Sequence, residues 1–143
     1  MKTVEIYTDG ACSGNPGRGG YAAILLYGAK KKIVAGGEKE TTNNRMEMRA
    51  VIEALGALNQ PCEVKIYSDS SYVVNAFNEG WLQNWQRTNF NNHKIKNIDL
   101  WEQLAERLKP HKYMFIKVKG HSDNEYNNEC DRLAVAEVLK IEN

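Results

Sequence analysis

The sequence has 143 residues, with 19 basic and 18 acidic side chains and a net charge of +1. A chain of this length can bury its own core, so one domain is expected, and the balanced charge means that any nucleic-acid surface must be local. The three cysteines are odd in number and widely spaced, which argues against a disulfide framework or a zinc site. The N-terminus has no apolar run for a signal peptide or a membrane span, so we expect a cytoplasmic protein.

Three strands are predicted first along the chain. Apolar and polar residues alternate over 3–9, which predicts a strand that ends at Asp9. A glycine-rich loop is expected over 10–20. The apolar run over 21–27 predicts a second strand, and residues 32–35 are expected to return as the second arm of a hairpin.

Helices and strands alternate in the rest of the chain. The remaining predicted elements are a helix over 45–58, a strand over 64–68, a short helix from Ser70 and Ser71 through Phe77, a helix over 99–108, a strand over 113–118 and a helix over 125–140. A three-stranded meander followed by helix-separated strands indicates an α/β fold with a mixed sheet and helices against its faces.

Two acidic residues fall on otherwise apolar helix faces. Glu47 shares a face of its helix with Val51 and Leu55, where an unpaired carboxylate is costly. A capping box between Asn44 and Glu47 is the alternative, and it is the simpler interpretation of Glu47 taken alone. Asp131 interrupts the apolar stripe of the last helix, which has begun well before it, so a cap does not explain this acid. The stripe contains Asn127, Asp131, Ala134, Val135 and Val138.

Two further acids stand at predicted strand ends. Asp9 precedes a glycine, as turn residues do, and Asp69 precedes two serines, as a helix cap does. Together with Glu47 and Asp131, they can converge at one end of the sheet. Clustered carboxylates stay ionised only beside a cation, and oxygen ligands suit Mg²⁺ or Mn²⁺ better than zinc. Two such ions can activate a water and stabilise a leaving alkoxide, so the residues indicate phosphodiester cleavage.

Four motifs together resemble the type 1 ribonuclease H family of bacteria. They are TDGACSGNPG at 8–17, TTNNRMEMRA at 41–50, YSDSSYV at 67–73 and GHSDNEYNNECDRLA at 120–134. The resemblance spans almost the whole chain and implies a single domain over 1–143. It implies the ribonuclease H-like fold, a five-stranded mixed sheet with helices on both faces and the second strand antiparallel to the rest.

The resemblance also implies an activity. The expected protein is a monomeric endoribonuclease that hydrolyses the RNA strand of RNA–DNA hybrids to 5′-phosphate and 3′-hydroxyl products. The family's metal-binding carboxylates match Asp9, Glu47, Asp69 and Asp131, with Mg²⁺ or Mn²⁺ as cofactor and two ions when the substrate is bound. The family's catalytic histidine matches His121, which could accept or relay a proton near the metals.

Substrate contacts are carried over by the same resemblance. The RNA strand is expected to contact Cys12, Asn15, Asn43 and Ser71, although Cys12 could equally be a small buried residue. Thr42 and Asn97 match parts of a pocket for a phosphate of the DNA strand. In the segment 81–98, which matches the family's basic protrusion, Trp85 and Phe90 would pack on deoxyribose, and Arg87, Lys94 and Lys96 would meet phosphates. Its aromatic residues could instead belong to the core, and we expect this for Trp81.

Two alternatives stay open. A nuclease of a related fold could act on DNA, although the match at Asn15 and Asn43 argues against it. An inactive hybrid-binding module would be expected to lack one of the four acids, and all four are present.

Overall fold

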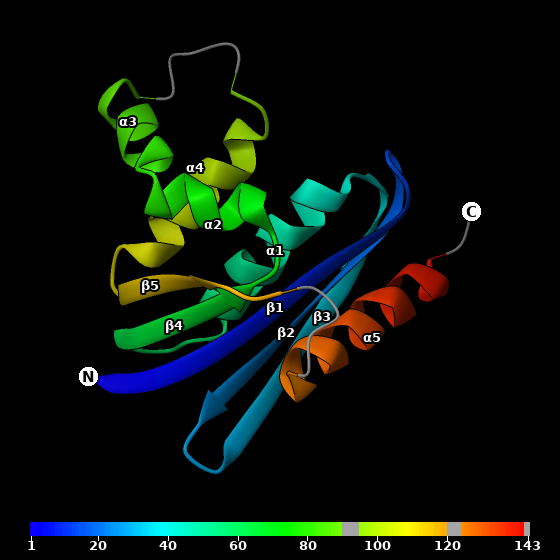
Figure 1. Ribbon diagram of the computed structural model, residues 1–143, viewed down its shortest axis with the longest axis horizontal. Helices are drawn as coiled ribbons and strands as arrows, with labels where there is room; N and C mark the ends of the chain where they lie inside the picture. Colours follow the sequence, from blue (N-terminus) through cyan, green and yellow to red (C-terminus); the bar gives the residue numbers. More distant parts are fainter. Residues whose placement is uncertain (90–94, 120–123, 142–143) are drawn as a thin grey trace.

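The computed structural model describes residues 1–89, 95–119 and 124–141, and within them five strands form one mixed sheet (Figure 1). The spatial order is β3-β2-β1-β4-β5. The strands are β1 (Lys2–Gly14), β2 (Gly17–Tyr27), β3 (Lys30–Thr41), β4 (Cys62–Ser68) and β5 (Lys112–Lys117). Strand β2 pairs antiparallel with β1 and β3, whereas β4 is parallel to β1 and β5 is parallel to β4. The predicted mixed sheet, with its second strand antiparallel to the rest, is confirmed.

Helices cover both faces of this sheet. They are α1 (Asn43–Gly56), α2 (Ser71–Asn78), α3 (Trp81–Arg87), α4 (Ile98–Leu108) and α5 (Glu125–Lys140). Residues of α1, α2 and α4 share a large core with one face of the sheet, and α5 packs on the opposite face. No helix within the described ranges is long and apolar enough to cross a membrane.

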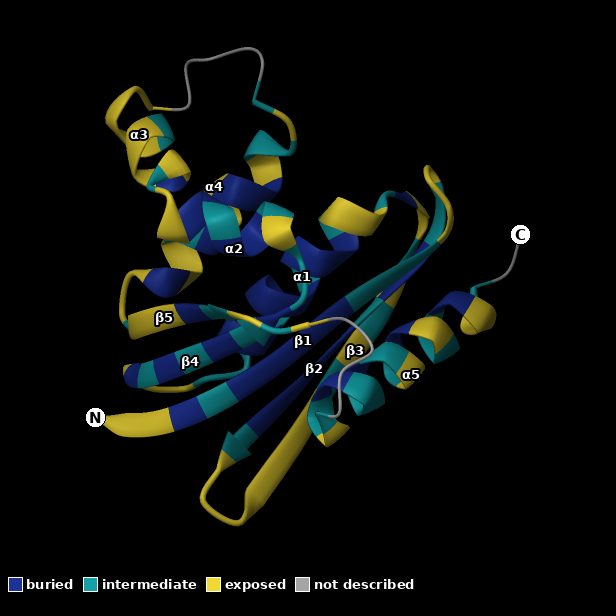
Figure 2. Cartoon of the chain, in the orientation of Figure 1, coloured by how far each residue is buried: buried dark blue, intermediate teal, exposed yellow. Residues whose placement is uncertain are grey.

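Alternation along the strands sends neighbouring side chains to the two faces. On β1, Ile6 joins the core under α1, whereas Tyr7 joins the smaller cluster under α5. The same alternation on β2 separates Leu25 from Ile24. Figure 2 shows the consequence, since the central strands and the inner side of α1 are buried while much of β3 is exposed.

The glycine-rich stretch differs from the prediction. Residues 10–14 continue β1, and β2 begins at Gly17, so the predicted loop is a hairpin whose strands pair up to Gly14 opposite Gly17. Glycine normally weakens a strand, but here the ladder between β1 and β2 supplies the backbone partners. At Gly10, a Cβ would lie 2.6 Å from the backbone nitrogen of Glu47. The glycine therefore allows α1 to approach β1 closely.

The cap of α1 and the buried face of α5 also differ from the prediction. Thr42 caps α1, because its hydroxyl accepts a hydrogen bond from the Arg45 backbone nitrogen at 3.3 Å, so the expected capping box of Asn44 and Glu47 is wrong. On α5, Val135 is 44% exposed and does not lie on the buried stripe. The buried residues of that helix are Asn127, Cys130, Ala134 and Val138.

Candidate metal centre

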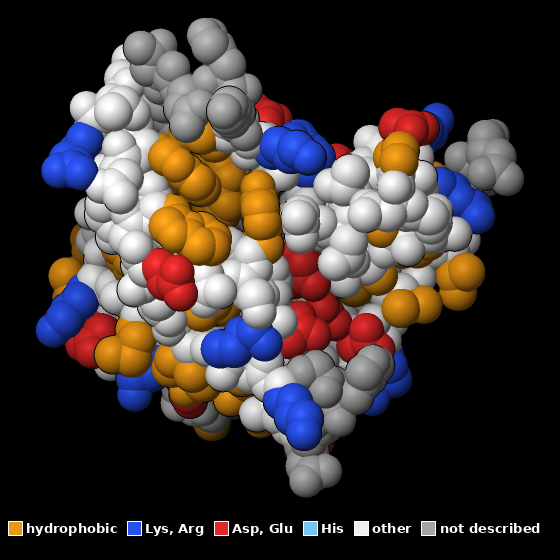
Figure 3. Space-filling model, turned by 45° about the horizontal axis from the view of Figure 1, so that its top comes forward, with side chains coloured by type: hydrophobic (Ala, Val, Ile, Leu, Met, Phe, Trp, Pro, Cys, Tyr) orange, Lys and Arg blue, Asp and Glu red, His pale blue; other side chains and the backbone are white. Residues whose placement is uncertain are grey.

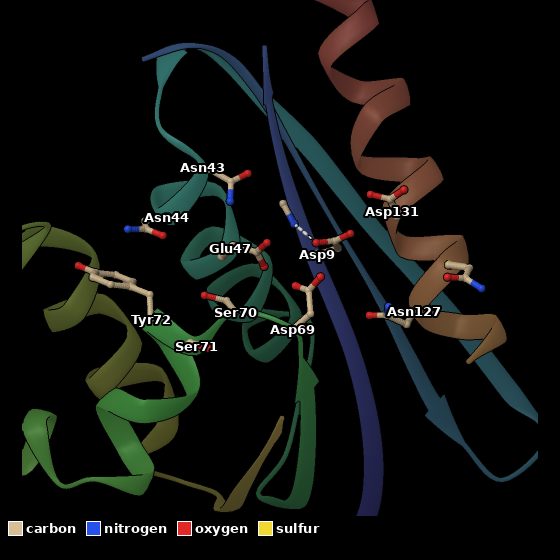
Figure 4. A pocket seen from close by; sticks show the side chains of 12 residues that line it. Asp9, Asn43, Asn44, Glu47, Asp69, Ser70, Ser71, Tyr72, Asn127 and Asp131 are labelled. Atoms are coloured by element: carbon tan, nitrogen blue, oxygen red, sulfur yellow. Dashed lines mark hydrogen bonds between the residues drawn. The ribbon is translucent and has the colours of Figure 1, made fainter. Parts of the chain in front are cut away.

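Three carboxylates from three separate elements meet at one edge of the sheet. Asp9 lies on β1, Glu47 on α1, and Asp69 directly after β4, and each offers an oxygen within 4.8 Å of the others (Figure 4). The strand register explains the first pair. Tyr7 is paired with Tyr67 in the parallel ladder, so Asp9 and Asp69, each two residues further on, lie side by side where the pairing of β1 with β4 ends.

Glu47 reaches this group because α1 crosses β1 at Gly10. The helix begins at Asn43, and Glu47 is in its second turn, facing the strand. Glu47 is 4% exposed, and Asp9 is 5% exposed. The Gly10 backbone nitrogen donates a hydrogen bond to Asp9 Oδ1 at 2.9 Å. Two of the three carboxylates are therefore held almost entirely out of water.

The fourth predicted acid stands on the other side of the same cavity. Asp131 lies on α5, is half-buried, and lines the cavity without belonging to the three-residue group. Figure 4 shows it across from Glu47, with Asp9 between them. The cavity has a volume of about 360 Å³ and is lined by Asp9, Gly10, Asn43, Asn44, Glu47, Asp69, Ser70, Ser71, Tyr72, Asn127, Asn128 and Asp131.

Helix capping does not account for Asp69. The cap of α2 is Ser70, whose hydroxyl accepts a hydrogen bond from the Val73 backbone nitrogen at 3.2 Å. Ser70 therefore takes the role that the sequence offered to Asp69, and the Asp69 carboxylate lines the cavity instead. In the space-filling view, carboxylates are visible at the bottom of a hollow near the centre of the molecule (Figure 3).

The electrostatics of the group favour a cation. Burial, and then the charge of Asp69, raise the pKa of Asp9 to about 7. Burial, followed by the charges of Asp9 and Asp69, raises the pKa of Glu47 well above its ordinary range. Glu47 Oε2 is buried and has no hydrogen-bond partner among the described residues. The buried Glu47 oxygen therefore has room for a further partner, and an all-oxygen donor set of this kind fits a hard divalent ion.

Comparison with known proteins supplies the family. The family model described as RNase H matches residues 1–138. The chain belongs to the ribonuclease H family. A ribonuclease H of Caldanaerobacter subterraneus subsp. tengcongensis is 60% identical over 140 residues, which is 96% of this chain and 92% of that protein. The chain is accordingly a hydrolase of the ribonuclease H class.

Solved structures agree on the fold. The crystal structure of LC9-RNase H1, a type 1 RNase H with the type 2 active-site motif, is 28% identical, with a TM-score of 0.88 and coverage of 97% of this chain and 73% of that chain. LC11-RNase H1 in complex with an RNA/DNA hybrid is 21% identical, with a TM-score of 0.69 and coverage of 96% and 97%. The ribonuclease H-like fold expected from the sequence is confirmed.

Among the residues predicted to contact RNA, Asn43 and Ser71 lie in the wall of the cavity, and Asn15 contacts Asn43. The Asn43 backbone nitrogen donates to Asn15 Oδ1 at 3.0 Å, which ties the tip of the β1–β2 hairpin to the start of α1. Asn43 and Ser71 line the cavity itself. Cys12 is half-buried, and its thiol donates to the Thr41 carbonyl oxygen at 3.5 Å.

The two residues predicted for a DNA-phosphate pocket are linked through Arg45. The Thr42 hydroxyl accepts from the Arg45 backbone nitrogen, and Arg45 Nη1 donates to Asn97 Oδ1 at 3.2 Å. Asn97 also donates to the Tyr72 hydroxyl at 3.1 Å. The structure therefore brings Thr42 and Asn97 into one local network between α1 and the start of α4.

The segment 81–98 is only partly described. Trp81 is 38% exposed, so its expected place in the core is wrong; the short helix α3 buries Leu82 instead. Trp85 is half-buried, with its ring 5.5 Å from that of Trp101. Arg87 and Lys96 are exposed. Three other predicted site residues, Phe90, Lys94 and His121, lie outside the described residues.

Asn127 is a wall residue to which the sequence assigned no role. It stands one helical turn before Asp131 on α5 and is 2% exposed. Asn127 precedes Asp131 by four residues on the same helix, and this spacing is the sequence feature that could have indicated that both lie at the site. The aromatic residue Tyr72 also lines the cavity, and the sequence did not predict it as a site residue.

Proposed function

We propose that this chain is a divalent-metal-dependent endonuclease that hydrolyses the RNA strand of RNA–DNA hybrids and leaves 5′-phosphate and 3′-hydroxyl ends. The observation that carries the proposal is the meeting of Asp9, Glu47 and Asp69 within 4.8 Å of one another. Membership of the ribonuclease H family gives this acidic group its reaction class.

Asp9, Glu47, Asp69 and Asp131 are the side chains that we propose hold Mg²⁺ or Mn²⁺, with two ions when the substrate is bound. The donors are all oxygens, and burial raises the pKa of Asp9 and of Glu47, which is the behaviour of acids that need a counter-charge. A bound divalent ion supplies a Lewis acid that lowers the pKa of a water and stabilises the leaving oxygen.

The RNA strand would be aligned by residues at the rim of the cavity. Asn43 and Ser71 line it, and Asn15 accepts a hydrogen bond from the Asn43 backbone. Amide and hydroxyl groups can bind the 2′-hydroxyl that distinguishes RNA from DNA. Cys12, two residues beyond Gly10 on the same strand, completes the proposed contact set.

The DNA strand would bind on the side of the molecule formed by α2, α3 and α4. Thr42 and Asn97 would bind a phosphate, and the exposed Arg87 and Lys96, with Lys94, would meet further phosphates. Trp85, with Phe90, would pack on deoxyribose. LC11-RNase H1, which shares the fold, was crystallised with an RNA/DNA hybrid.

His121 is the proposed proton carrier. It matches the family's catalytic histidine and lies four residues before Glu125, the first residue of α5. An imidazole at this place would take or relay a proton during hydrolysis or product release. We further propose that the chain acts as a monomeric single domain over 1–143 in the cytoplasm.

The test is a gel assay with four end-labelled substrates of one sequence: an RNA–DNA hybrid, an RNA duplex, a DNA duplex and single-stranded RNA. We expect cutting of the RNA strand of the hybrid alone, loss of cutting with a chelator, and recovery when Mg²⁺ is restored. Cleavage of the DNA duplex at a comparable rate would favour a DNA nuclease of related fold. Tight hybrid binding without any cleavage would favour an inactive binding module.

A further inference from the structure

The carboxamide oxygen of Asn127 is buried, and no group within residues 1–89, 95–119 and 124–141 bonds to it. Asn127 is 2% exposed, and its Oδ1 has no hydrogen-bond partner among the described residues, whereas its backbone nitrogen donates to Asn124 Oδ1 at 2.9 Å. A buried carbonyl oxygen that lacks a donor lowers stability, and such oxygens in folded proteins are nearly always satisfied. The position therefore needs a hydrogen-bond donor that the described protein groups do not supply.

Among the parts that the structure describes, the cavity is the space from which a donor can reach this oxygen. Asn127 lines it, and in Figure 4 its carboxamide points toward the carboxylates of Asp9 and Asp69. When a cation is bound, the carboxylates are ionised and only accept hydrogen bonds, so they do not then satisfy another acceptor. A water bound to a divalent cation is a strong donor, and the cavity of about 360 Å³ has room for a hydrated ion.

The turn of α5 that carries Asn127 is firmly placed. Cys130, on the next turn, is fully buried, and its thiol donates to the Tyr7 carbonyl oxygen at 3.4 Å, two residues before Asp9. The ring of Tyr126 stacks on that of Tyr7 with centroids 5.3 Å apart. These contacts hold Asn127 at a set position relative to the strand that carries Asp9.

We propose that Asn127 is a positioning residue whose carboxamide oxygen accepts a hydrogen bond from a water on a divalent ion held by the carboxylates. This inference rests on the proposed function, because it requires that the acidic group binds the ion. Asn127 and Asp131 are four residues apart, so one face of α5 presents both a carboxylate and a neutral acceptor. Asn127 would orient the water of the ion without adding a negative charge.

The test measures metal binding without substrate. Mn²⁺ is titrated by calorimetry into metal-free wild type, Asn127→Leu, Asn127→Asp and Asn128→Leu, and the thermal midpoint of each metal-free protein is recorded. Asn128 is the matched control, because it also lines the cavity and is the next residue on the helix. We expect Asn127→Leu to raise the Mn²⁺ Kd by about 10- to 100-fold. Its metal-free midpoint should be unchanged or higher, since an unpaired buried oxygen is removed.

The two other variants complete the design. Asn127→Asp keeps an acceptor oxygen and should bind Mn²⁺ at least as tightly as wild type, and Asn128→Leu should change the Kd by less than about 3-fold. A wild-type Kd in Asn127→Leu, or weaker binding in Asn127→Asp, would overturn the inference and leave the proposed function standing. If Asn127→Leu does not fold, the Asn127→Asp titration decides. If wild type binds no Mn²⁺, both the inference and the proposed function fail.

Discussion

Gly10 and Glu47 are in backbone contact: a Cβ at Gly10 would lie 2.6 Å from the Glu47 nitrogen and 2.8 Å from the Met46 carbonyl carbon. Both neighbours are main-chain atoms, so neither can rotate away. The distance at which α1 crosses β1 therefore depends on the missing side chain. That distance sets how close the Glu47 carboxylate lies to Asp9, which immediately precedes Gly10 on the strand.

Gly10→Ala should push α1 away from β1. We expect a loss of stability of about 1–3 kcal/mol from overpacking, together with a loss of hybrid cleavage larger than the unfolded fraction explains. Denaturant unfolding and cleavage rates measure the two effects. Gly28→Ala is the control, because Gly28 lies in the distant β2–β3 turn and a Cβ there meets nothing within 4 Å. Since the φ of Gly28 is +57°, we expect this control to lose a little stability and to keep its cleavage rate. Full activity in Gly10→Ala would contradict the link between this contact and the site.

The metal-free protein should lose stability as the pH rises toward 7. Burial, and then the charge of Asp69, raise the pKa of Asp9 from its ordinary 3.8 to about 7. A carboxyl group whose pKa is higher in the folded state binds its proton more tightly there. Its contribution to stability is complete below the unfolded pKa and is lost as the pH rises through the folded pKa.

Asp9→Asn isolates this effect. Urea unfolding in the presence of a chelator, at several pH values between about 4 and 8, should show wild type weakening relative to Asp9→Asn by up to about 1.4 kcal/mol per pH unit. Saturating Mg²⁺ should restore wild-type stability at neutral pH, because the ion binds the folded state. Parallel pH profiles of the two proteins in chelator would refute the pKa assignment.

The basic segment should set the salt dependence of hybrid binding. Lys94→Ala combined with Lys96→Ala removes two proposed phosphate contacts, so binding should weaken and the slope of log K against log salt should become shallower by about 1–2. Lys30→Ala combined with Lys32→Ala removes the same charge from the start of β3, and neither lysine lines the cavity. If both double variants lower the slope equally, the contact surface is not the one proposed.

His121→Ala should slow hydrolysis without weakening the metal site. The proposed role of His121 is proton transfer, so cleavage should fall by about 10²- to 10⁴-fold while the Mn²⁺ Kd of the free protein stays constant. Calorimetry and single-turnover cleavage separate the two quantities. An unaltered single-turnover rate would remove His121 from the chemistry, and a much weaker Kd would make it a metal-site residue instead.

Much of the site could be predicted because its acids break local patterns. Glu47 interrupts an apolar helix face, and Asp9 and Asp69 end strands, and these features are visible in one sequence. The alternative interpretation, a capping box between Asn44 and Glu47, is wrong because α1 begins at Asn43 and Thr42 is its cap. Which of several neighbouring polar residues caps a helix depends on the backbone conformation at the helix start, which the periodicity of apolar residues does not report.

Other features depend on contacts between distant segments. Residues 10–14 look like a loop because glycine is rare in strands, yet pairing of β1 with β2 keeps them extended. Val135 matches the apolar stripe of α5 by spacing, but the helix is rotated so that Cys130 faces the sheet and Val135 faces outward. The burial of the Asn127 carboxamide oxygen without a partner among the described residues could not be predicted from the sequence, because its surroundings come from β1, α1 and α5 together.

The most direct test of the central claim compares hybrid cleavage by wild type and by Asp9→Asn at saturating Mg²⁺, with the fold of each checked by circular dichroism. We expect Asp9→Asn to be folded and to lack measurable cleavage, because one carboxylate of the metal-binding group is gone. A folded Asp9→Asn protein that cuts the RNA strand at a substantial fraction of the wild-type rate would contradict it.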